Sequence, residues 1–380
     1  MKDKRILFVY YKLYKAGGVA RVLVSLANEL VKNGYGVTIL LLMDNKESFY
    51  DLDKKVNIVT IDTFSHWGFT KINVNLDKYG SKLPFKNNIK NYIYDFGQWQ
   101  MLNRWMNANH HKYDLIISSW YKLSAQLALN KNVANKTIAW EHISFDVGGL
   151  LWNKSLRRFY KNLKGIISIN QPGKFYYQQL NTNVQVIPNL MGEDLENLNE
   201  VEYHTKENTI LIPSRLDPEK NLSEFLEIIK LVEFKDGWKI KIFGNGKEEQ
   251  LLRDIITKEK LTNVYLNKAI SPAEILNELK RSKIVCMTSL KEGLPTILIE
   301  GLFTSNVLIS YNCNFGPSDI INENNGFLIP MHDKKLFQEK LQYLINHPSQ
   351  LAQLSQSSYE DSKKWRKDKI ITQWIQFLDR

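Results

Sequence analysis

The stretch Glu292-Gly-Leu-Pro-Thr-Ile-Leu-Ile-Glu300 decides how the second half of this chain folds and where its chemistry lies. It follows the apolar, β-prone run Ile284–Thr288 and leads into a helix that we expect to begin near Thr296. Glu292 therefore belongs to the loop at the carboxyl end of a buried strand, and Glu300 lies one turn inside the helix. From the residues alone, this pair could bind hydroxyl groups of one ligand or could simply be solvated.

The turn between the two glutamates is a candidate phosphate-binding element. Backbone amides at the start of a helix have no partner within the helix and favour an anion. The candidate contact residues are Gly293, Leu294, Pro295, Thr296 and Ile297.

The rest of the second half alternates strands with helices. Strands are expected at 209–213, 239–243, 264–266, 284–288 and 307–310, and helices near 222–234, 247–259, 272–281 and 296–303. The helix at 272–281 has a start signal, with Ser271 as N-cap, Pro272 next and Glu274 at the third position. Alternation of this kind predicts a parallel, doubly wound sheet with its ligand at the carboxyl ends of the strands.

The first half opens with a similar unit. Arg5–Tyr10 is β-prone, Val19–Lys32 has a helical apolar stripe, and Val37–Met43 is typical of a buried strand. Further strands are expected at 56–61, 114–118, 137–140, 165–169 and 184–187. Residues 63–100 are interpreted as irregular, either an insertion or an acceptor-contacting region. With 380 residues, the chain is predicted to form two Rossmann-like domains joined near 188–199.

Two cations follow the expected strand Thr209–Pro213. In the run Pro213-Ser-Arg215-Leu-Asp-Pro-Glu-Lys220-Asn221, a guanidinium and an ammonium stand at a strand end. Arg215 as a fork and Lys220 as a point charge could neutralise a diphosphate. Taken without the carboxylate block downstream, they would be interpreted as surface charges.

Charge is distributed unevenly along the chain. Residues 1–190 contain 26 Lys and Arg against 12 Asp and Glu, whereas residues 191–380 contain 25 against 28. A basic first half indicates contact with an anionic membrane surface or a pyrophosphate-linked acceptor, and plain solubility is the alternative. Nucleic acid is not expected, because no helix-turn-helix, zinc-finger or RNP-type pattern is present.

Neither a disulfide framework nor a metal site is expected. The two cysteines, Cys286 and Cys313, stand beside apolar residues and are interpreted as buried in a reducing compartment. Asp51-Leu-Asp53 resembles a metal-binding Asp-x-Asp but lies in a polar stretch and is interpreted as solvated. No run approaches the ~20 apolar residues of a membrane span, so we expect a cytoplasmic protein that is peripheral at most.

These blocks together resemble retaining glycosyltransferase family 4, over nearly the whole chain and most strongly over 209–330. The pattern E-G-L-P-x-x-x-x-E after a buried strand is that family's signature, and the Arg215/Lys220 block precedes it in the expected order. The resemblance implies the GT-B fold, with two Rossmann-like domains facing a cleft. It implies an acceptor-side domain at 1–190, a nucleotide-sugar donor domain at 191–358, and a C-terminal helix at about 359–380 that crosses back to the first domain.

The resemblance also assigns roles to the matching residues. It implies that Arg215 and Lys220 contact the donor diphosphate, that Glu292 binds hydroxyls of the donor sugar, and that Glu300 binds the ribose. Gly17 and Gly18 would lie against the phosphates or the acceptor, and His142 in Trp140-Glu-His142 would bind the donor sugar. Phe243-Gly244-Asn-Gly246 matches the glycine turn near the nucleotide, and its lack of a third glycine argues against NAD.

The expected activity is metal-independent transfer of a hexose or N-acetylhexosamine from a nucleotide diphosphate-sugar, most often UDP-linked in this family, with no cofactor. The acceptor would be a saccharide or a lipid-linked saccharide of bacterial surface-polysaccharide or lipopolysaccharide biosynthesis. The alternatives are a GT-B-fold epimerase or phosphorylase, a non-catalytic nucleotide-sugar-binding subunit and, more remotely, a basic RNA-binding protein.

Overall fold

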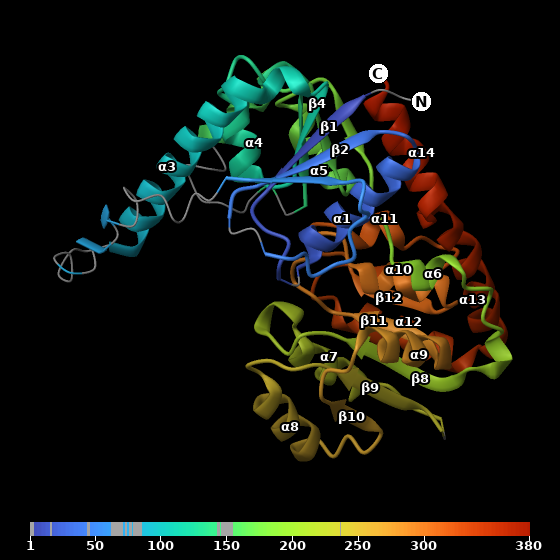
Figure 1. Ribbon diagram of the computed structural model, residues 1–380. Helices are drawn as coiled ribbons and strands as arrows, with labels where there is room; N and C mark the ends of the chain where they lie inside the picture. The colour runs from blue at the N-terminus through green and yellow to red at the C-terminus, as the bar shows by residue number, and fades with distance from the viewer. Residues whose placement is uncertain are drawn as a thin grey trace. The chain divides into compact units, whose positions relative to one another are not determined.

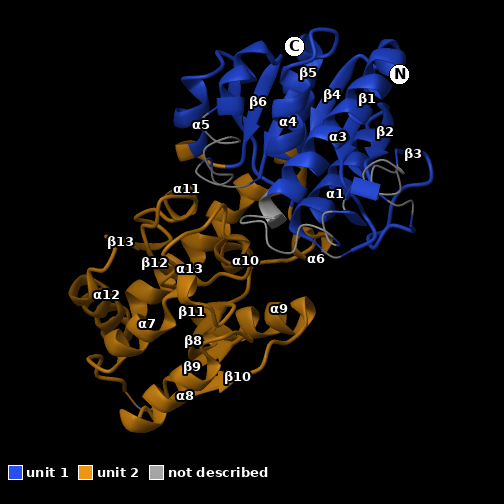
Figure 2. Ribbon diagram, turned by 90° about the vertical axis from the view of Figure 1, so that its left-hand side faces the viewer, with its two compact units in different colours: residues 1–169, 173–190, 371–380 blue, residues 170–172, 191–370 orange. Residues whose placement is uncertain are grey.

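The computed structural model describes residues 4–15, 17–43, 46–61, 71–72, 74–75, 78, 86–142, 145, 155–235 and 237–380. The chain divides into two compact units. Unit 1 comprises residues 1–169, 173–190 and 371–380, and unit 2 comprises residues 170–172 and 191–370 (Figure 2). Each unit is built on its own sheet.

Unit 1 is a seven-stranded sheet in the order β3-β2-β1-β4-β5-β6-β7, and every pairing in it is parallel. Figure 1 shows its elements in blue to green. The strands are β1 (Arg5–Tyr10), β2 (Gly36–Leu41), β3 (Asn57–Thr60), β4 (Leu115–Ser118), β5 (Thr137–Glu141), β6 (Gly165–Ser168) and β7 (Val184–Val186). The principal helices are α1 (Gly18–Lys32), α3 (Lys86–Asn109), α4 (Tyr121–Ala128) and α5 (Gln171–Gln178).

Unit 2 is a six-stranded parallel sheet in the order β10-β9-β8-β11-β12-β13. The strands are β8 (Glu207–Pro213), β9 (Lys239–Phe243), β10 (Val264–Asn267), β11 (Ser282–Met287), β12 (Val307–Tyr311) and β13 (Gly326–Ile329). The helices are α6 (Glu193–Glu196), α7 (Leu222–Ile229), α8 (Glu249–Lys258), α9 (Pro272–Arg281), α10 (Thr296–Phe303), α11 (Pro317–Ile320), α12 (Lys334–Asn346) and α13 (Pro348–Ser362). The last helix, α14 (Lys367–Leu378), begins in unit 2 and belongs to unit 1 from residue 371 onward.

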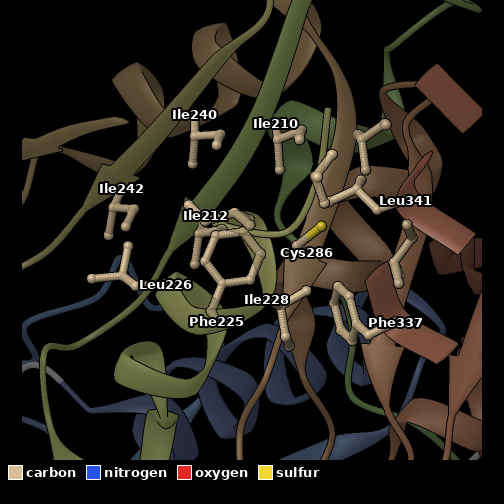
Figure 3. Close-up of a cluster of buried hydrophobic side chains, with 14 of the residues drawn as sticks. Ile210, Ile212, Phe225, Leu226, Ile228, Ile240, Ile242, Cys286, Phe337 and Leu341 are labelled. Atoms are coloured by element: carbon tan, nitrogen blue, oxygen red, sulfur yellow. The ribbon is translucent and has the colours of Figure 1, made fainter. Parts of the chain in front are cut away.

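Alternate residues of the unit 2 strands face two separate cores. Ile210 and Ile212 of β8 pack with α7, α8 and α12, whereas Leu211 between them packs with α9 and α10. Figure 3 shows the first of these clusters, with Phe225 and Phe337 beside Cys286. Because both faces of the sheet are covered, its strands are apolar on both sides. The predicted α/β class with two doubly wound parallel sheets is confirmed.

Several local predictions are also confirmed. Ser271 caps α9, accepting a hydrogen bond from the Glu274 amide, while the Glu274 side chain accepts one from the Ser271 amide. The helix at Thr296–Phe303 has the predicted bounds. Cys286 and Cys313 are both buried free thiols.

The interpretation of 63–100 as irregular is wrong over residues 86–100, which lie in the long helix α3. Polar and aromatic residues alternate there without a strong apolar stripe, so the sequence carries little helical periodicity. Residues 62–70, 79–85 and others of that range lie outside the described residues.

The C-terminal stretch is two helices rather than one beginning near Tyr359. α13 ends at Ser362, α14 begins at Lys367, and residues 371–380 belong to unit 1. Trp374 of α14 packs edge-on against Trp140 of β5, with ring centroids 4.9 Å apart. The Leu378 carbonyl accepts a hydrogen bond from Lys4 at 2.8 Å.

Candidate functional site

The chain order of unit 2 reverses between β8 and β11. From β8 the connections lead outward through β9 to β10, whereas from β11 they lead the other way to β12 and β13. Loops that leave neighbouring strands toward opposite sides open a crevice at the carboxyl ends of those strands. A cavity of about 260 Å³ lies there, and Arg215, Lys220, Glu292, Leu294, Pro295, Thr296 and Ile297 line it.

Lys220 and Glu292 form an ion pair inside this cavity. The Lys220 Nζ lies 2.7 Å from Glu292 Oε1, and the two side chains are 15% and 16% exposed. The Lys220 loop is fixed to the end of β11, because Thr288 Oγ1 donates to the carbonyls of Lys220 and Asn221 and the Leu290 amide donates to Glu219. The cation is therefore held in place by backbone contacts as well as by its carboxylate partner.

Arg215 stands at the mouth of the same cavity and is much more exposed. Its side chain is 63% exposed, and its guanidinium pairs with Asp217 at 2.5 Å and with Glu219. Exposed pairs of this kind contribute little to stability because water competes for both charges. An incoming anion can therefore replace these carboxylates at small cost.

The amino end of α10 also lines the cavity. Thr296 and Ile297 line the cavity, and the N-cap residue is Pro295, whose side chain cannot accept a hydrogen bond. The turn before it is packed tightly: a Cβ on Gly316, whose φ is +93°, would lie 2.5 Å from the Pro295 ring and 2.8 Å from the Gly293 carbonyl. The Asn170 side chain also donates to that carbonyl at 2.9 Å. The amides of the first turn are therefore pre-positioned for an anion.

Three candidate residues of unit 2, Gly244, Gly293 and Glu300, do not line the cavity. Glu300 lies one turn further along α10. Gly244 packs behind the loop after β8, where a Cβ would lie 1.8 Å from the Ser214 carbonyl oxygen. Glycine is therefore required at 244 by the close approach of two backbones.

His142 directly follows β5 in unit 1, with its ring 4.3 Å from that of Trp140 between centroids. Burial lowers the pKa of His142 to about 3, and the nearby Asn189 amide opposes the decrease. Within the described ranges neither ring nitrogen has a hydrogen-bond partner. The imidazole is therefore neutral at physiological pH and suited to hydrogen bonding rather than to acid–base chemistry.

Gly17 and Gly18 stand at the start of α1. Gly17 is its N-cap, and its amide donates to the Tyr50 hydroxyl at 3.0 Å. A Cβ at either glycine would meet no atom within 4 Å among the described residues, so the backbone there is open to an approaching group.

Sequence reasoning did not single out Thr288 and Ser289, which line the unit 2 cavity directly after β11 and are both 2% exposed. Their position at the end of a predicted strand was the available signal. Over the described ranges, no three His, Cys, Asp or Glu side chains gather as a potential metal site. Likewise, no described helix is both long and apolar enough to cross a bilayer.

Comparison with known proteins gives matches over most of the chain. A family model described as "Glycosyltransferase Family 4" matches residues 16–191, and "Glycosyl transferases group 1" matches 193–361.

Two curated relatives align over nearly their whole length. The amylovoran biosynthesis glycosyltransferase AmsD of Erwinia amylovora is 27% identical, over 99% of each chain. The N-acetylgalactosaminyltransferase of Campylobacter jejuni that acts on GalNAc-α-(1→4)-GalNAc-α-(1→3)-diNAcBac-PP-undecaprenol is 24% identical, over 98% of each. Among solved structures, Anabaena Alr3699/HepE in complex with UDP superposes with a TM-score of 0.71 at 14% identity, over 99% of each chain, and supports the fold.

Proposed function

Since this chain belongs to glycosyltransferase family 4, we propose that it transfers a hexose or N-acetylhexosamine from a UDP-sugar to a saccharide or lipid-linked acceptor, with retention of configuration. The acceptor would belong to bacterial surface-polysaccharide or lipopolysaccharide biosynthesis, as the names of the Erwinia and Campylobacter relatives suggest. The observation that carries the proposal is the cavity of unit 2, where Arg215, Lys220 and the first turn of α10 surround one space.

The proposed chemistry is stabilisation of a departing diphosphate. As the bond from the sugar's anomeric carbon to the phosphate oxygen breaks, negative charge grows on the leaving group. Lys220 would exchange its bond to Glu292 for a phosphate oxygen, and Arg215 would exchange Asp217 and Glu219 for another. The amides at Thr296 and Ile297, which line the same cavity, add further donors. Two cations and a helix terminus can supply this charge stabilisation without a metal, and we propose a metal-independent reaction.

The remaining roles concern the sugars. Once Lys220 turns to the phosphate, Glu292 is released to accept hydrogen bonds from hydroxyls of the donor sugar. Glu300 would bind the ribose, Gly17 and Gly18 would lie along the phosphates or acceptor, and neutral His142 would hydrogen-bond the donor sugar. In a retaining reaction of this type a donor phosphate oxygen takes the proton of the acceptor hydroxyl, so no protein nucleophile is needed.

We also propose that the protein is cytoplasmic and contacts an anionic membrane through α3. Ile89, Tyr92 and Phe96 recur along one side of that helix and are 36%, 53% and 55% exposed. Figure 1 shows α3 extending beyond the sheet of unit 1, and residues 1–190 have the basic excess described above. An apolar strip on a basic domain fits an anionic lipid interface. Sedimentation with phosphatidylglycerol vesicles, but not with phosphatidylcholine vesicles, is the expected result, and half-molar NaCl should reduce it.

A thermal-shift panel tests the donor assignment. UDP and UDP-sugars should raise the unfolding temperature, because a ligand at 100 times its Kd stabilises by about 2.7 kcal/mol. NAD and ATP should leave it unchanged, and Lys220→Ala should abolish the response to UDP. A shift with NAD alone, or an equal UDP response in the variant, would contradict the proposal.

Turnover separates the proposal from its alternatives. A transferase releases UDP faster when an acceptor is added. An epimerase converts the UDP-sugar without acceptor, and a phosphorylase requires phosphate. A non-catalytic binding subunit binds the UDP-sugar but shows no turnover with any acceptor.

A further inference from the structure

The residue after Lys220 has a backbone conformation that few side chains adopt. Asn221 lies between the short helical turn Pro218–Lys220 and helix α7, and its backbone is left-handed, with φ +53° and ψ +41°. A side chain other than glycine is disfavoured there, because its Cβ comes too close to a carbonyl oxygen, and asparagine tolerates the conformation best when its own side chain is hydrogen-bonded. The path of the chain through Lys220 therefore depends on what holds Asn221.

The Asn221 side chain is held by a carboxylate of α7. Its Nδ2 donates to Glu224 Oε2 at 2.6 Å. The Asn221 carbonyl, like that of Lys220, accepts a hydrogen bond from Thr288 Oγ1 at 3.2 Å. The left-handed residue is thus fixed at its side chain by α7 and at its backbone by the residue that follows β11.

Glu224 is fixed in turn by residues at the ends of two strands. The hydroxyl of Tyr311, the last residue of β12, is donated to Glu224 Oε1 at 2.7 Å, and His332, three residues after β13, places Nδ1 2.9 Å from Oε2. The Glu224 side chain is 14% exposed. Burial alone would raise the pKa of Glu224, but hydrogen bonds from Asn221, Tyr311 and His332 lower it below its ordinary value. Glu224 is therefore an ionised carboxylate at neutral pH.

Glu224, Asn221 and Tyr311 do not line the cavity, so a ligand there contacts Lys220 but not the groups behind it. Lysine has many rotamers, and a fixed backbone reduces the entropy that is lost when its ammonium binds a phosphate. We infer that Glu224 is a positioning residue, which keeps Asn221 left-handed and thereby orients Lys220 toward the diphosphate. This inference rests on the proposed function and deepens it, since it depends on Lys220 as the partner of the leaving group.

Two probes, UDP and uridine, separate positioning of Lys220 from a general structural role. Glu224→Ala should weaken UDP binding, measured by titration calorimetry, roughly tenfold, because Lys220 is no longer preorganised. Uridine, which lacks the diphosphate, should bind both proteins equally in a saturation-transfer NMR titration. Glu227→Ala removes another carboxylate of the same helix, which pairs with Lys334 at 2.9 Å, and should leave both affinities unchanged.

Substitutions of Asn221 test the route through the left-handed residue. Asn221→Gly removes the hydrogen bond to Glu224, but glycine adopts positive φ without steric cost, so this variant should retain the affinity for UDP. Adding Glu224→Ala to it should cause no further loss of UDP binding. Asn221→Ala removes the same hydrogen bond and disfavours the left-handed region, so it should weaken UDP roughly tenfold. The two single variants of Asn221 keep Glu224 and decide the inference even where Glu224→Ala fails to fold.

Stability and UDP binding should therefore separate. Glu224→Ala should lower the unfolding temperature with or without Asn221→Gly, because the buried Tyr311 hydroxyl loses its acceptor. A merely structural role would instead weaken UDP to the same extent in both backgrounds, and that result would overturn the inference. It is also overturned if Glu224→Ala leaves the UDP affinity unchanged, if UDP and uridine weaken equally, or if Asn221→Gly and Asn221→Ala bind UDP equally well.

Failure here is distinguishable from failure of the proposed function. A wild-type protein that does not bind UDP loses the donor assignment, and a Lys220→Ala variant that binds UDP as tightly as the wild type removes Lys220 from the diphosphate. Where both of those tests succeed and the Glu224 and Asn221 variants fail theirs, the donor site stands and only the positioning role of Glu224 is lost.

Discussion

The two units share one topology but use charge in opposite ways. In unit 1, Glu141 and Arg157 form an ion pair whose side chains are 1% and 0% exposed, and Glu141 also accepts from the hydroxyls of Tyr160 and Tyr177. In unit 2, the Lys220–Glu292 pair is 15–16% exposed and lines a cavity. A fully buried ion pair with additional hydrogen-bond donors can only stabilise the packing around it. An ion pair that lines a cavity can exchange one partner for a ligand.

The cavities at the two switch points differ in the same sense. The unit 2 cavity has two cations and a helix amino end, which suit a diphosphate. The unit 1 cavity, where Tyr11 follows β1 and Trp120 follows β4, has aromatic walls, the Lys122–Asp95 ion pair and a further lysine, Lys90. The fold therefore places a cavity at the switch point of each sheet, and the side chains that line it decide which ligands would suit it.

The largest effect is expected when the buried Glu141–Arg157 ion pair of unit 1 is broken. Glu141→Ala leaves Arg157 buried without its carboxylate and should cost about 3–5 kcal/mol, as for other broken buried pairs. Hydrogen exchange of the β5 and β6 amides should accelerate accordingly. The matched change in unit 2, Glu292→Ala, should cost less than this in the exchange of β11, because its partner Lys220 is 15% exposed and lines a cavity. Equal costs in the two units would refute the distinction drawn above.

Removal of the cavity cations should come next. Lys220→Ala and Arg215→Ala should each lower kcat by at least ~10²-fold, which is the usual loss for one preorganised charge contact. Steady-state UDP release measures this. Lys230→Ala changes a surface lysine paired with Glu259 and serves as a control that should leave kcat unchanged. Near-normal turnover in both cavity variants would remove Arg215 and Lys220 from the leaving-group role.

Acidification should destabilise unit 1 through His142. Its pKa is about 3 in the folded protein, whereas an unperturbed histidine has a pKa of 6.5, so the unfolded chain binds the extra proton between these values. The stabilisation is complete above pH ~6.5 and is lost as pH falls toward 3, by up to ~1.4 kcal/mol per pH unit. The expected result is a flatter pH dependence of unfolding in His142→Asn than in the wild type. Parallel curves would show that His142 is not buried neutral.

The smallest effect tests a purely local feature of unit 2. Ser271→Ala removes the cap of α9 and should lower stability by about 1 kcal/mol, measured by hydrogen exchange in α9. The response to UDP should not change, since Ser271 does not line the cavity. Loss of UDP binding would mean that the site depends on more of unit 2 than its cavity walls.

Local signals explain which parts of the fold could be predicted. Alternating apolar residues such as those of Lys239–Phe243, and the start signal at Ser271, act within a few residues, so the bounds predicted for these elements are the bounds observed. The helical part of 86–100 was missed, because a helix made of asparagine, tyrosine and tryptophan owes its stability to what it packs against. Strand β13 follows a polar turn and has only four residues, which is too short for a periodic signal.

The sequence by itself determined the alternation of strands and helices, and with it the two parallel sheets and the strand ends where Arg215, Lys220 and Glu292 stand. Such features depend on neighbours close along the chain. Only the tertiary structure decided which ion pair is fully buried and which lines a cavity. It also decided that Tyr11, Asp95 and Trp120 line one cavity. These relations join residues far apart in sequence, and burial and distance in space have no counterpart in local pattern.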